Sequence, residues 1–512
     1  MTNIGKNENR IHAYALPALL VLFFGIYFFN LFGEKLFYYS NGLGIDGGVY
    51  GRMLRGLPQS LYDGTIEPYW YQKFFPVIIA RGVLELSGLH IDNPLIVKAY
   101  MLINAGCITG SVLLYFMIAK KLKFSLSKSA IGFLLLFFNF GLLKFAPYEP
   151  LLNDSVALLL SFILLYCYLA DNWKLGFFVS LFGLFTFPLV IWLTAAILFS
   201  FKKAHKTPAT LSMPLRIIAL CLALFPAVIT AYNYFFNFER FDFYSYYGLA
   251  VISLDSVTGA VLLVLSLLAV SWFLFQGFNM LFRLINVNNI LQHIYWNRLI
   301  LFVGQYALLK VILHLFTNNE FNQGRTSFHF IENISYQSLV YPFGFLISHF
   351  MFFGSIVLLF CFGARQYLNR ISIQDNSIFL LMLFNFFFLI STESREFIYL
   401  LPFVGYIVLQ NINEKIVNNS IFLSLIFIVN LTVSLFWFKI NVPGIYEPVE
   451  NKLVFPWQRF YMILGPWRNT EMFTLFGMLT LLCAALIWYQ IKRTNTALVK
   501  QLPGNTLDYE QK

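Results

Sequence analysis

Three short polar segments interrupt the long apolar runs of this 512-residue chain and hold its main candidates for chemistry. The first is GLGIDGGVY, residues 42–50, in which Asp46 stands among glycines. Glycine lets a backbone approach a ligand closely, and a carboxylate held there can take a proton from a hydroxyl group. Asp46 is therefore the first candidate for a catalytic carboxylate. The alternative is that Asp-Gly only forms a favourable turn.

The second segment, APYEPLLNDS at residues 146–155, carries two acids in a very short connection. Both are therefore expected at one end of the flanking helices. Asp154 could contribute to a binding site, or it could cap the next helix together with its polar neighbours. Capping alone does not explain Glu149, which lies directly before a proline.

The third segment is STESREFIYLLP, residues 391–402, with Arg395 at its centre. A planar guanidinium is well suited to hold two phosphate oxygens at once. The alternative is a local ion pair with Glu393 or Glu396.

A further pair of ionisable residues, Lys310 and His314, lies four residues apart within an apolar run. Ionisable groups at such a depth usually face a cavity or a partner, because exposure to lipid is costly. They could help to bind an anionic headgroup. Lys310 could instead extend along the helix towards the water phase.

The apolar runs that position these residues predict an all-α, polytopic bundle of transmembrane helices. The chain is 59% hydrophobic and only 12% charged, and about 20 mainly apolar residues suffice to cross a membrane. About 14 spans are expected. They lie near residues 12–33, 94–119, 128–145, 154–170, 175–187, 188–201, 213–236, 258–280, 299–316, 341–363, 377–391, 396–412, 419–438 and 471–491.

The distribution of basic residues gives this bundle a direction. Lys and Arg are enriched in cytoplasmic loops, so the basic segment before the first span is placed inside, as part of an uncleaved anchor. Alternating the sides from there puts a net charge of +14 on the cytoplasmic side and −3 on the outer side, out of the total of +11, provided that residues 175–201 form two spans. Both termini are then cytoplasmic, and the three polar segments share the outer face. The compact inner loops and the composition suggest a bacterial inner membrane.

One membrane domain, residues 1–491, is expected, followed by a cytoplasmic tail at 492–512. Its largest outer loops span residues 34–93 and 439–470. In the first of these, residues 48–57 and 73–86 mix apolar and charged positions as helices lying in the headgroup region do. The basic residues are scattered over many loops, which argues against nucleic acid as a partner, and the five cysteines all fall within apolar runs.

These motifs resemble the GT-C superfamily of membrane glycosyltransferases, which includes protein O-mannosyltransferases and the aminoarabinose transferase of lipid A. The resemblance covers most of the chain through its layout and through short motifs. These motifs are Ile-Asp-Gly-Gly-Val-Tyr at 45–50, Tyr-Glu-Pro at 148–150 with Asn-Asp at 153–154, Leu-Phe-Thr-Phe-Pro at 184–188 and Arg-Glu-Phe-Ile-Tyr-Leu-Leu-Pro at 395–402. In the last of these, the tyrosine stands one place later than in the family pattern.

The resemblance implies a hexosyl or pentosyl transfer from a polyprenyl-phosphate sugar to a lipid, glycan or protein acceptor at the outer face. Asp46 would then be the general base, Arg395 would hold the donor phosphate, and Tyr50, Glu149 and Asp154 would support substrate binding. It also raises the possibility of a divalent cation, Mg or Mn, on Asp46, Glu149 or Asp154. Many family members carry paired acids in the first loop, whereas Asp46 is flanked by glycines, so the metal stays open.

Three other classes of protein remain as alternatives. A polymerase or ligase of lipid-linked glycans would depend on outer-loop arginines more than on a first-loop acid. A transporter or flippase would show broken helices and charges near the midplane of the membrane. A non-catalytic subunit would keep the fold without the chemistry.

Overall fold

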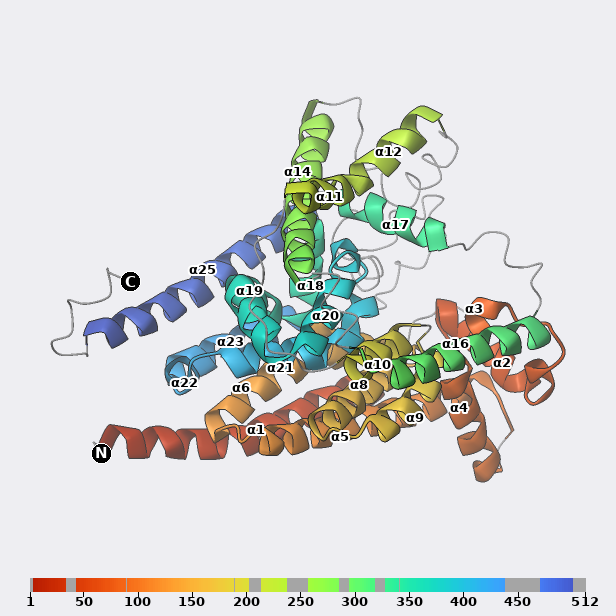
Figure 1. The fold of residues 1–512 in the computed structure, drawn as a ribbon. Helices are drawn as coiled ribbons and strands as arrows, with labels where there is room; N and C mark the ends of the chain where they lie inside the picture. Colours follow the sequence, from red (N-terminus) through yellow and green to blue (C-terminus); the bar gives the residue numbers. More distant parts are fainter. Residues whose placement is uncertain are drawn as a thin grey trace.

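The computed structural model describes residues 3–33, 43–88, 90–187, 189–201, 213–236, 257–284, 294–317, 327–339, 341–437 and 470–500, and these residues are almost entirely helical (Figure 1). Within them the only β pairing is an isolated bridge between Phe201 and Ile294. The all-α prediction is therefore confirmed. The predicted outer loop at 439–470, except for its last residue, and the end of the predicted tail lie outside the described residues.

The first half of the described chain runs through fourteen helical elements. They are α1 (Asn3–Gly33), α2 (Ile45–Gly56), η1 (Gln59–Leu61), α3 (Pro68–Tyr71), α4 (Phe74–Ser87), α5 (Asn93–Lys121), α6 (Leu126–Phe137), η2 (Gly141–Phe145), α7 (Ala146–Tyr148), α8 (Asp154–Leu169), α9 (Trp173–Leu184), α10 (Val190–Ser200), α11 (Met213–Ala223) and α12 (Phe225–Phe236).

The second half follows the same pattern of long and short helices. Its described elements are α14 (Val257–Leu284), α16 (Trp296–Phe316), α17 (Ser327–Leu339), α18 (Gly344–Phe353), α19 (Ser355–Gln374), α20 (Asn376–Asn385), η6 (Phe388–Ile390), η7 (Ser394–Leu400), α21 (Leu401–Asn411), α22 (Glu414–Val417), α23 (Ser420–Val433) and α25 (Thr470–Lys500). Helix α25 extends nine residues past the predicted boundary at 491, so the first part of the predicted tail is helical.

Five described helices are long and apolar enough to cross a membrane, or seven if each of two bent pairs forms one span. The five segments are Tyr14–Gly33, Asn93–Lys121, Gly259–Phe282, Trp296–Phe316 and Phe473–Thr494. The bent pairs turn by 55° after Phe137 and by 42° after Ala223. Other predicted spans correspond to apolar helices of 10–17 residues, which rise at only 1.5 Å per residue and do not reach the usual spanning length. The described helices are therefore consistent with an integral membrane protein and do not confirm the count of 14.

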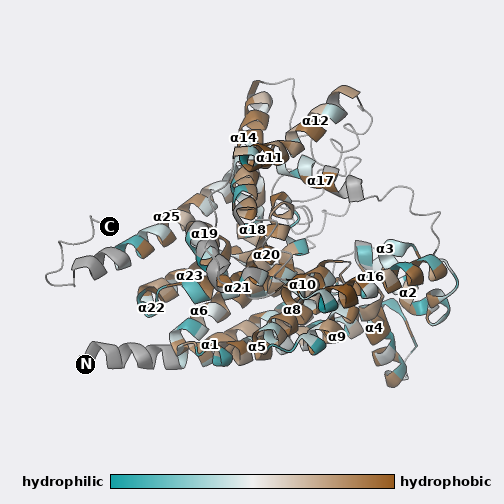
Figure 2. Ribbon diagram, in the orientation of Figure 1, coloured by the Kyte–Doolittle hydropathy of each residue, from teal (hydrophilic) through white to brown (hydrophobic). Residues whose placement is uncertain are grey.

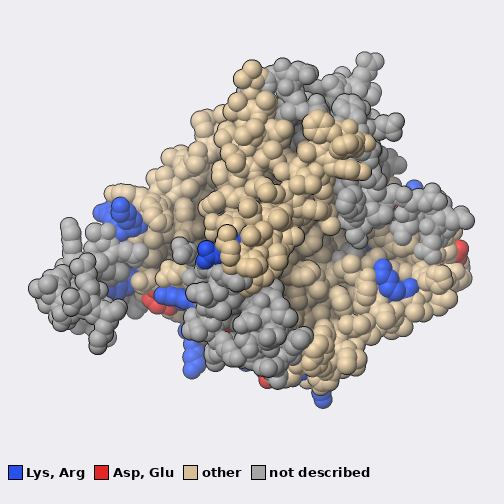
Figure 3. Space-filling model, turned by 45° about the horizontal axis from the view of Figure 1, so that its top comes forward, with Lys and Arg blue, Asp and Glu red and all other residues tan. Residues whose placement is uncertain are grey.

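Most of the helices are apolar along much of their length (Figure 2), and many of their large apolar side chains are exposed. Large side chains such as Val264, Leu268 and Leu301 are exposed on α14 and α16. In the face drawn in Figure 3, most of the visible charged side chains lie towards the two ends, with a broad uncharged surface between them. This distribution is the one that a lipid environment favours, because charged groups are costly in hydrocarbon.

The segment 175–201 forms two helices, as the topology prediction required. Helix α9 ends at Leu184 and α10 begins at Val190, and the two pack against each other. Gly183 permits this contact, because a Cβ atom there would lie 2.4 Å from Ile191. The chain therefore reverses within a few residues.

Helix α8 lies at the centre of the structure and packs against α5, α9, α10, α21 and η7. Asn430 of α23 ties the other side of the core together, since its amide accepts from the backbone of Ser355 at 2.8 Å and donates to the carbonyl of Leu134 at 2.8 Å. The amino end of α1 and the carboxyl end of α25 lie at one end of the molecule, while α2, α3 and α4 lie at the opposite end (Figure 1). Most of the candidate residues gather near this opposite end, where the start of α2 meets η7 and the connection before α8.

Candidate functional site

Asp46 lies in the first turn of α2, where its carboxylate is partly exposed. The sequence led to the expectation of a glycine-rich turn, and this expectation is corrected by the structure. Gly44 precedes the helix with a φ of 81°, a conformation that glycine adopts without strain. The turn is thus confined to the residues before the helix, and α2 itself holds Asp46.

Gly47 allows α2 to approach the connection that carries Glu149 and Asp154. A Cβ atom on Gly47 would lie 2.9 Å from both Cβ and Cδ2 of Leu151. Any larger residue would therefore push the start of α2 away from this connection. Gly47 therefore acts by allowing two elements to pack closely.

Arg395 joins this region from the other end of the chain. It lies in η7, where its Nε donates to Oε1 of Glu393 at 3.0 Å and its Nη2 lies 3.6 Å from Oδ2 of Asp46. The side chains of all three are between 15% and 21% exposed. The alternative of a local ion pair with Glu393 is therefore confirmed, and Arg395 also reaches the first-loop acid.

The position of η7 is fixed by His349 of α18. The Nε2 of His349 donates to the carbonyl of Leu389 at 2.8 Å, because that carbonyl can only accept. In the neutral ring, Nδ1 then accepts from the hydroxyl of Ser394 at 2.9 Å. His349 thus anchors the residue next to Arg395.

The two acids of the second segment are buried. Glu149 is 6% exposed and Asp154 is 4% exposed. Asp154 is the first residue of α8, and its Oδ2 has no hydrogen-bond partner in the described part of the chain. The N-cap residue Asn153 makes no capping hydrogen bond, and its amide instead donates to the carbonyl of Thr186 at 3.1 Å. Capping therefore does not account for this group of polar residues.

Lys73 is a further cation in this region that the sequence did not single out for the site. It is 8% exposed, its Nζ donates to the hydroxyl of Tyr69 at 2.7 Å, and it lies 4.2 Å and 4.9 Å from the ring centroids of Tyr69 and Trp70. A cation over aromatic faces is stabilised by the ring quadrupoles. In the sequence, Lys73 lies at the start of an amphipathic helix, where a lysine would be expected to contact lipid headgroups. Only the burial of Lys73 in the structure shows that it belongs to this site.

The charges at this site influence one another. Burial alone would lower the pKa of Arg395, but the carboxylates of Glu393, Asp46, Asp154 and Glu149 raise it well above its ordinary value. Arg395 therefore remains a cation throughout the physiological range.

Glu396, the second possible partner of Arg395, lies in the same helix η7, outside α21. Burial raises the pKa of Glu396 to about 8, with a further contribution from the charge of Glu393. The cations Arg395 and Lys73 act in the opposite direction without reversing the shift. This carboxyl group is therefore protonated over much of the neutral range, which limits the excess of negative charge around Arg395.

The remaining candidates are divided between this region and a distant helix. Tyr50 is 1% exposed, and burial, followed by the charge of Asp46, raises its pKa. Lys310 and His314 are exposed on α16, which packs on α9 and α10, and the ammonium of Lys310 lies 5.3 Å from the ring centroid of Tyr306. The structure thus brings Asp46, Tyr50, Glu149, Asp154 and Arg395 into one electrostatic group and does not place Lys310 among the charges that act on Arg395.

No protein-family profile, curated protein or solved structure matches this chain. The functional argument therefore depends on the charged group around Arg395. We call the set formed by Asp46, Arg395, Glu393, Asp154 and Lys73 the Asp46 site.

The guanidinium of Arg395 is the central cation of the Asp46 site. Within the described residues no group of three or more His, Cys, Asp or Glu side chains could hold a metal. The carboxylate of Asp46 instead faces a guanidinium. A phosphate oxygen could replace either carboxylate partner of Arg395 and would leave Asp46 available for proton transfer.

Proposed function

We propose that this chain is a membrane glycosyltransferase that moves a sugar from a polyprenyl-phosphate donor to an acceptor on the extracytoplasmic face. The observation that carries the proposal is the contact between Asp46 and Arg395. It places a candidate general base beside a candidate phosphate-binding residue. A lipid-linked donor needs such a pair at the end of a helix bundle, where its phosphate can meet water while its tail stays in hydrocarbon.

In this reaction the acceptor hydroxyl loses its proton to Asp46 as its oxygen attacks the anomeric carbon of the donor sugar. The new carbon–oxygen bond forms as the bond between that carbon and the phosphate oxygen breaks. The electron pair of the broken bond remains on polyprenyl phosphate. Arg395 stabilises the charge that develops there, as a fixed guanidinium does for a leaving phosphate, and Lys73 adds a second positive charge.

The proposal includes the architecture expected for the GT-C superfamily, with about 14 spans and with the helices α2 and α4 at the outer membrane surface. Both ends of the described chain lie opposite α2 and α4 (Figure 1), as cytoplasmic termini and an outer first loop require. The proposed location is a bacterial inner membrane.

A lipid-linked glycan polymerase or ligase is the second candidate. The observation that favours it is the central position of Arg395, since such an enzyme depends on outer-loop arginines. Such an enzyme needs two lipid-linked glycans, whereas the glycosyltransferase needs only one lipid-linked donor. A requirement for a second lipid-linked glycan therefore distinguishes the two candidates.

A transporter of lipid-linked sugars would use the bent helices instead. At the 55° bend between α6 and η2, the side chain of Asn139 provides hydrogen bonds for the backbone. It donates to the carbonyl of Leu136 at 2.9 Å and accepts from the backbone of Leu142 at 3.0 Å. Lys144, 1% exposed, donates to the carbonyl of Phe436 at 3.2 Å. These bonds give polar groups at and near the bend partners within the protein.

The direct assay uses the purified protein in proteoliposomes with radiolabelled polyprenyl-phosphate sugar. We expect release of polyprenyl phosphate together with a labelled acceptor. Movement of the intact donor between leaflets without cleavage would identify a transporter and overturn the proposal.

A further inference from the structure

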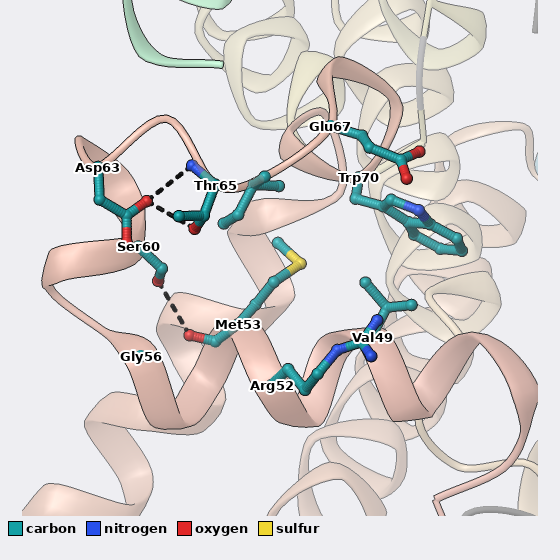
Figure 4. A pocket seen from close by; sticks show the side chains of 10 residues that line it. Val49, Arg52, Met53, Gly56, Ser60, Asp63, Thr65, Glu67 and Trp70 are labelled. Atoms are coloured by element: carbon teal, nitrogen blue, oxygen red, sulfur yellow. Dashed lines mark hydrogen bonds between the residues drawn. The ribbon is translucent and has the colours of Figure 1, made fainter. Parts of the chain in front are cut away.

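A cavity lies within the predicted first outer loop, beside the Asp46 site. It has a volume of about 350 Å³ and is lined by apolar and polar residues of α2 and of the segment from Ser60 to Trp70 (Figure 4). This volume falls in the lower part of the range found for small-molecule sites, about 300–1,000 Å³. The cavity therefore suits a compact ligand better than a long lipid tail.

The walls of this cavity combine one large aromatic ring with charged groups. Trp70 and Glu67 stand together on one side, Arg52 extends from α2 towards them, and Asp63 and Thr65 form the opposite wall (Figure 4). Asp63 is already held in place, because its Oδ1 accepts from the backbone and the hydroxyl of Thr65 at 2.9 Å and 2.7 Å. One wall is thus preorganised.

The groups on the other side are available to a ligand. No hydrogen bond or ion pair with the described part of the chain occupies the guanidinium of Arg52 or the carboxylate of Glu67. A guanidinium supplies donors in a plane and a carboxylate supplies acceptors. Together they match the adjacent hydroxyl groups of a sugar ring, and the electron-rich face of Trp70 matches its C–H face.

Trp70 also connects this cavity to the Asp46 site. Its ring lies edge-on to Tyr50 at 5.8 Å between centroids, and the ammonium of Lys73 lies 4.9 Å from its centroid. Arg52 follows Asp46 by six residues on α2, which is about 9 Å along a helix. A sugar bound in this cavity would therefore be separated from the reacting atoms by no more than the length of one or two sugar rings.

We propose that this cavity binds a pyranose ring of the acceptor, stacked on Trp70 and hydrogen-bonded by Arg52 and Glu67. The acceptor role rests on the proposed glycosyl transfer, whereas binding of a saccharide does not. Saccharide binding and the acceptor role can each be wrong independently, and the experiment tests each of them separately.

The test measures saturation-transfer NMR from the purified protein, in a detergent without sugar groups, to the methyl glycosides of glucose, galactose, mannose and N-acetylglucosamine. We expect transfer to at least one glycoside, and a decrease of at least fivefold in Trp70→Ala and in Arg52→Gln. Arg55→Gln is the matched control, because Arg55 is exposed on the same helix and does not line the cavity. Arg52→Gln also protects the test against misfolding, since Arg52 is exposed and makes no contact that folding needs.

Absence of transfer to every glycoside, or equal transfer in Arg52→Gln and Arg55→Gln, would overturn saccharide binding. For the acceptor role, Arg52→Gln should raise the KM for the acceptor about tenfold and leave the KM for the donor unchanged. An unchanged acceptor KM with lost glycoside binding would overturn that role alone. Asp46→Asn should retain glycoside binding, so a failure of the proposed transferase activity would leave this measurement interpretable.

Discussion

The guanidinium of Arg395 lies 3.6 Å from the carboxylate of Asp46, although the two residues are 349 positions apart in the sequence. This contact joins α2, in the predicted first outer loop, to η7, which precedes α21. Both groups keep an exposed fraction of about one fifth. They are therefore close enough to act on one substrate and open enough to meet it.

Replacing Arg395 should impair both donor use and stability. In Arg395→Lys the positive charge remains but the planar pair of donors is lost, so we expect kcat/KM for the polyprenyl-phosphate donor to fall at least tenfold with little loss of stability. Arg395→Ala should also lower the melting temperature in detergent, because Glu393 and Asp154 lose their counter-charge. Donor-dependent kinetics and thermal unfolding measure the two effects.

Equal activity of Arg395→Lys and the wild-type protein would contradict a bidentate role for Arg395. A matched control is Arg55→Lys, because Arg55 is exposed on α2 and makes no hydrogen bond or ion pair with the described part of the chain. This control should therefore retain full activity.

Gly47→Ala should reduce activity without unfolding the protein. The added methyl group would meet Leu151 at 2.9 Å, so α2 must move away from the connection that carries Glu149 and Asp154. A displacement of this size changes the geometry between Asp46 and Arg395, and small misplacements at a reacting centre cost up to about a hundredfold in rate.

Gly82→Ala is the control for this substitution, since nothing lies within 4 Å of a Cβ atom at Gly82 in α4. Alanine there should leave activity unchanged and slightly stabilise the helix. Transfer rates and circular dichroism of the two variants give the comparison. If both glycine variants kept full activity, the close approach of α2 to Leu151 would have no role in the site.

Most residues of this site could be predicted from the sequence. The others could be recognised only from their burial in the structure. The carboxylates of Asp46, Glu149 and Asp154 and the cation Arg395 stood out because each interrupts an apolar chain. Lys73 did not, since its neighbours on either side resemble an interfacial helix, and only the fold places its ammonium over Tyr69 and Trp70.

The helices themselves were predicted better than their role in a membrane. Mixed apolar and charged positions predicted α2 and α4 in the first loop, and the charge asymmetry between the two sides of the membrane favoured the division of residues 175–201 into two helices. The apolar run at 154–170 predicted α8 to within one residue. Run length did not predict that residues 394–400 would form a 3₁₀ helix, because that segment is held by tertiary contacts such as that of His349 with Ser394.

The raised pKa of Glu396 predicts a pH dependence of stability. An acid whose pKa is higher in the folded state takes up a proton on folding, so its contribution makes the protein less stable as pH rises from its ordinary value of 4.5 to about 8. Glu396→Gln cannot ionise. Its melting temperature should therefore equal that of the wild-type protein near pH 4.5 and exceed it by a growing margin up to about pH 8.

Thermal unfolding in detergent from pH 4.5 to above pH 8 measures this difference. Glu85→Gln is the matched control, because Glu85 is more than half exposed and its charge should make little difference at any pH. A difference between Glu396→Gln and wild type that did not change with pH would show that Glu396 is ionised in the folded protein.

The most direct test of glycosyl transfer at this site is the rate of Asp46→Asn in proteoliposomes with a polyprenyl-phosphate sugar. Asparagine has nearly the same shape but cannot accept the proton, and a general base contributes about 10²–10⁴ in rate. We expect transfer to fall at least a hundredfold while Glu85→Gln, measured in parallel, stays at the wild-type rate. Undiminished transfer by a normally folded Asp46→Asn protein would contradict the assignment of Asp46 as the base.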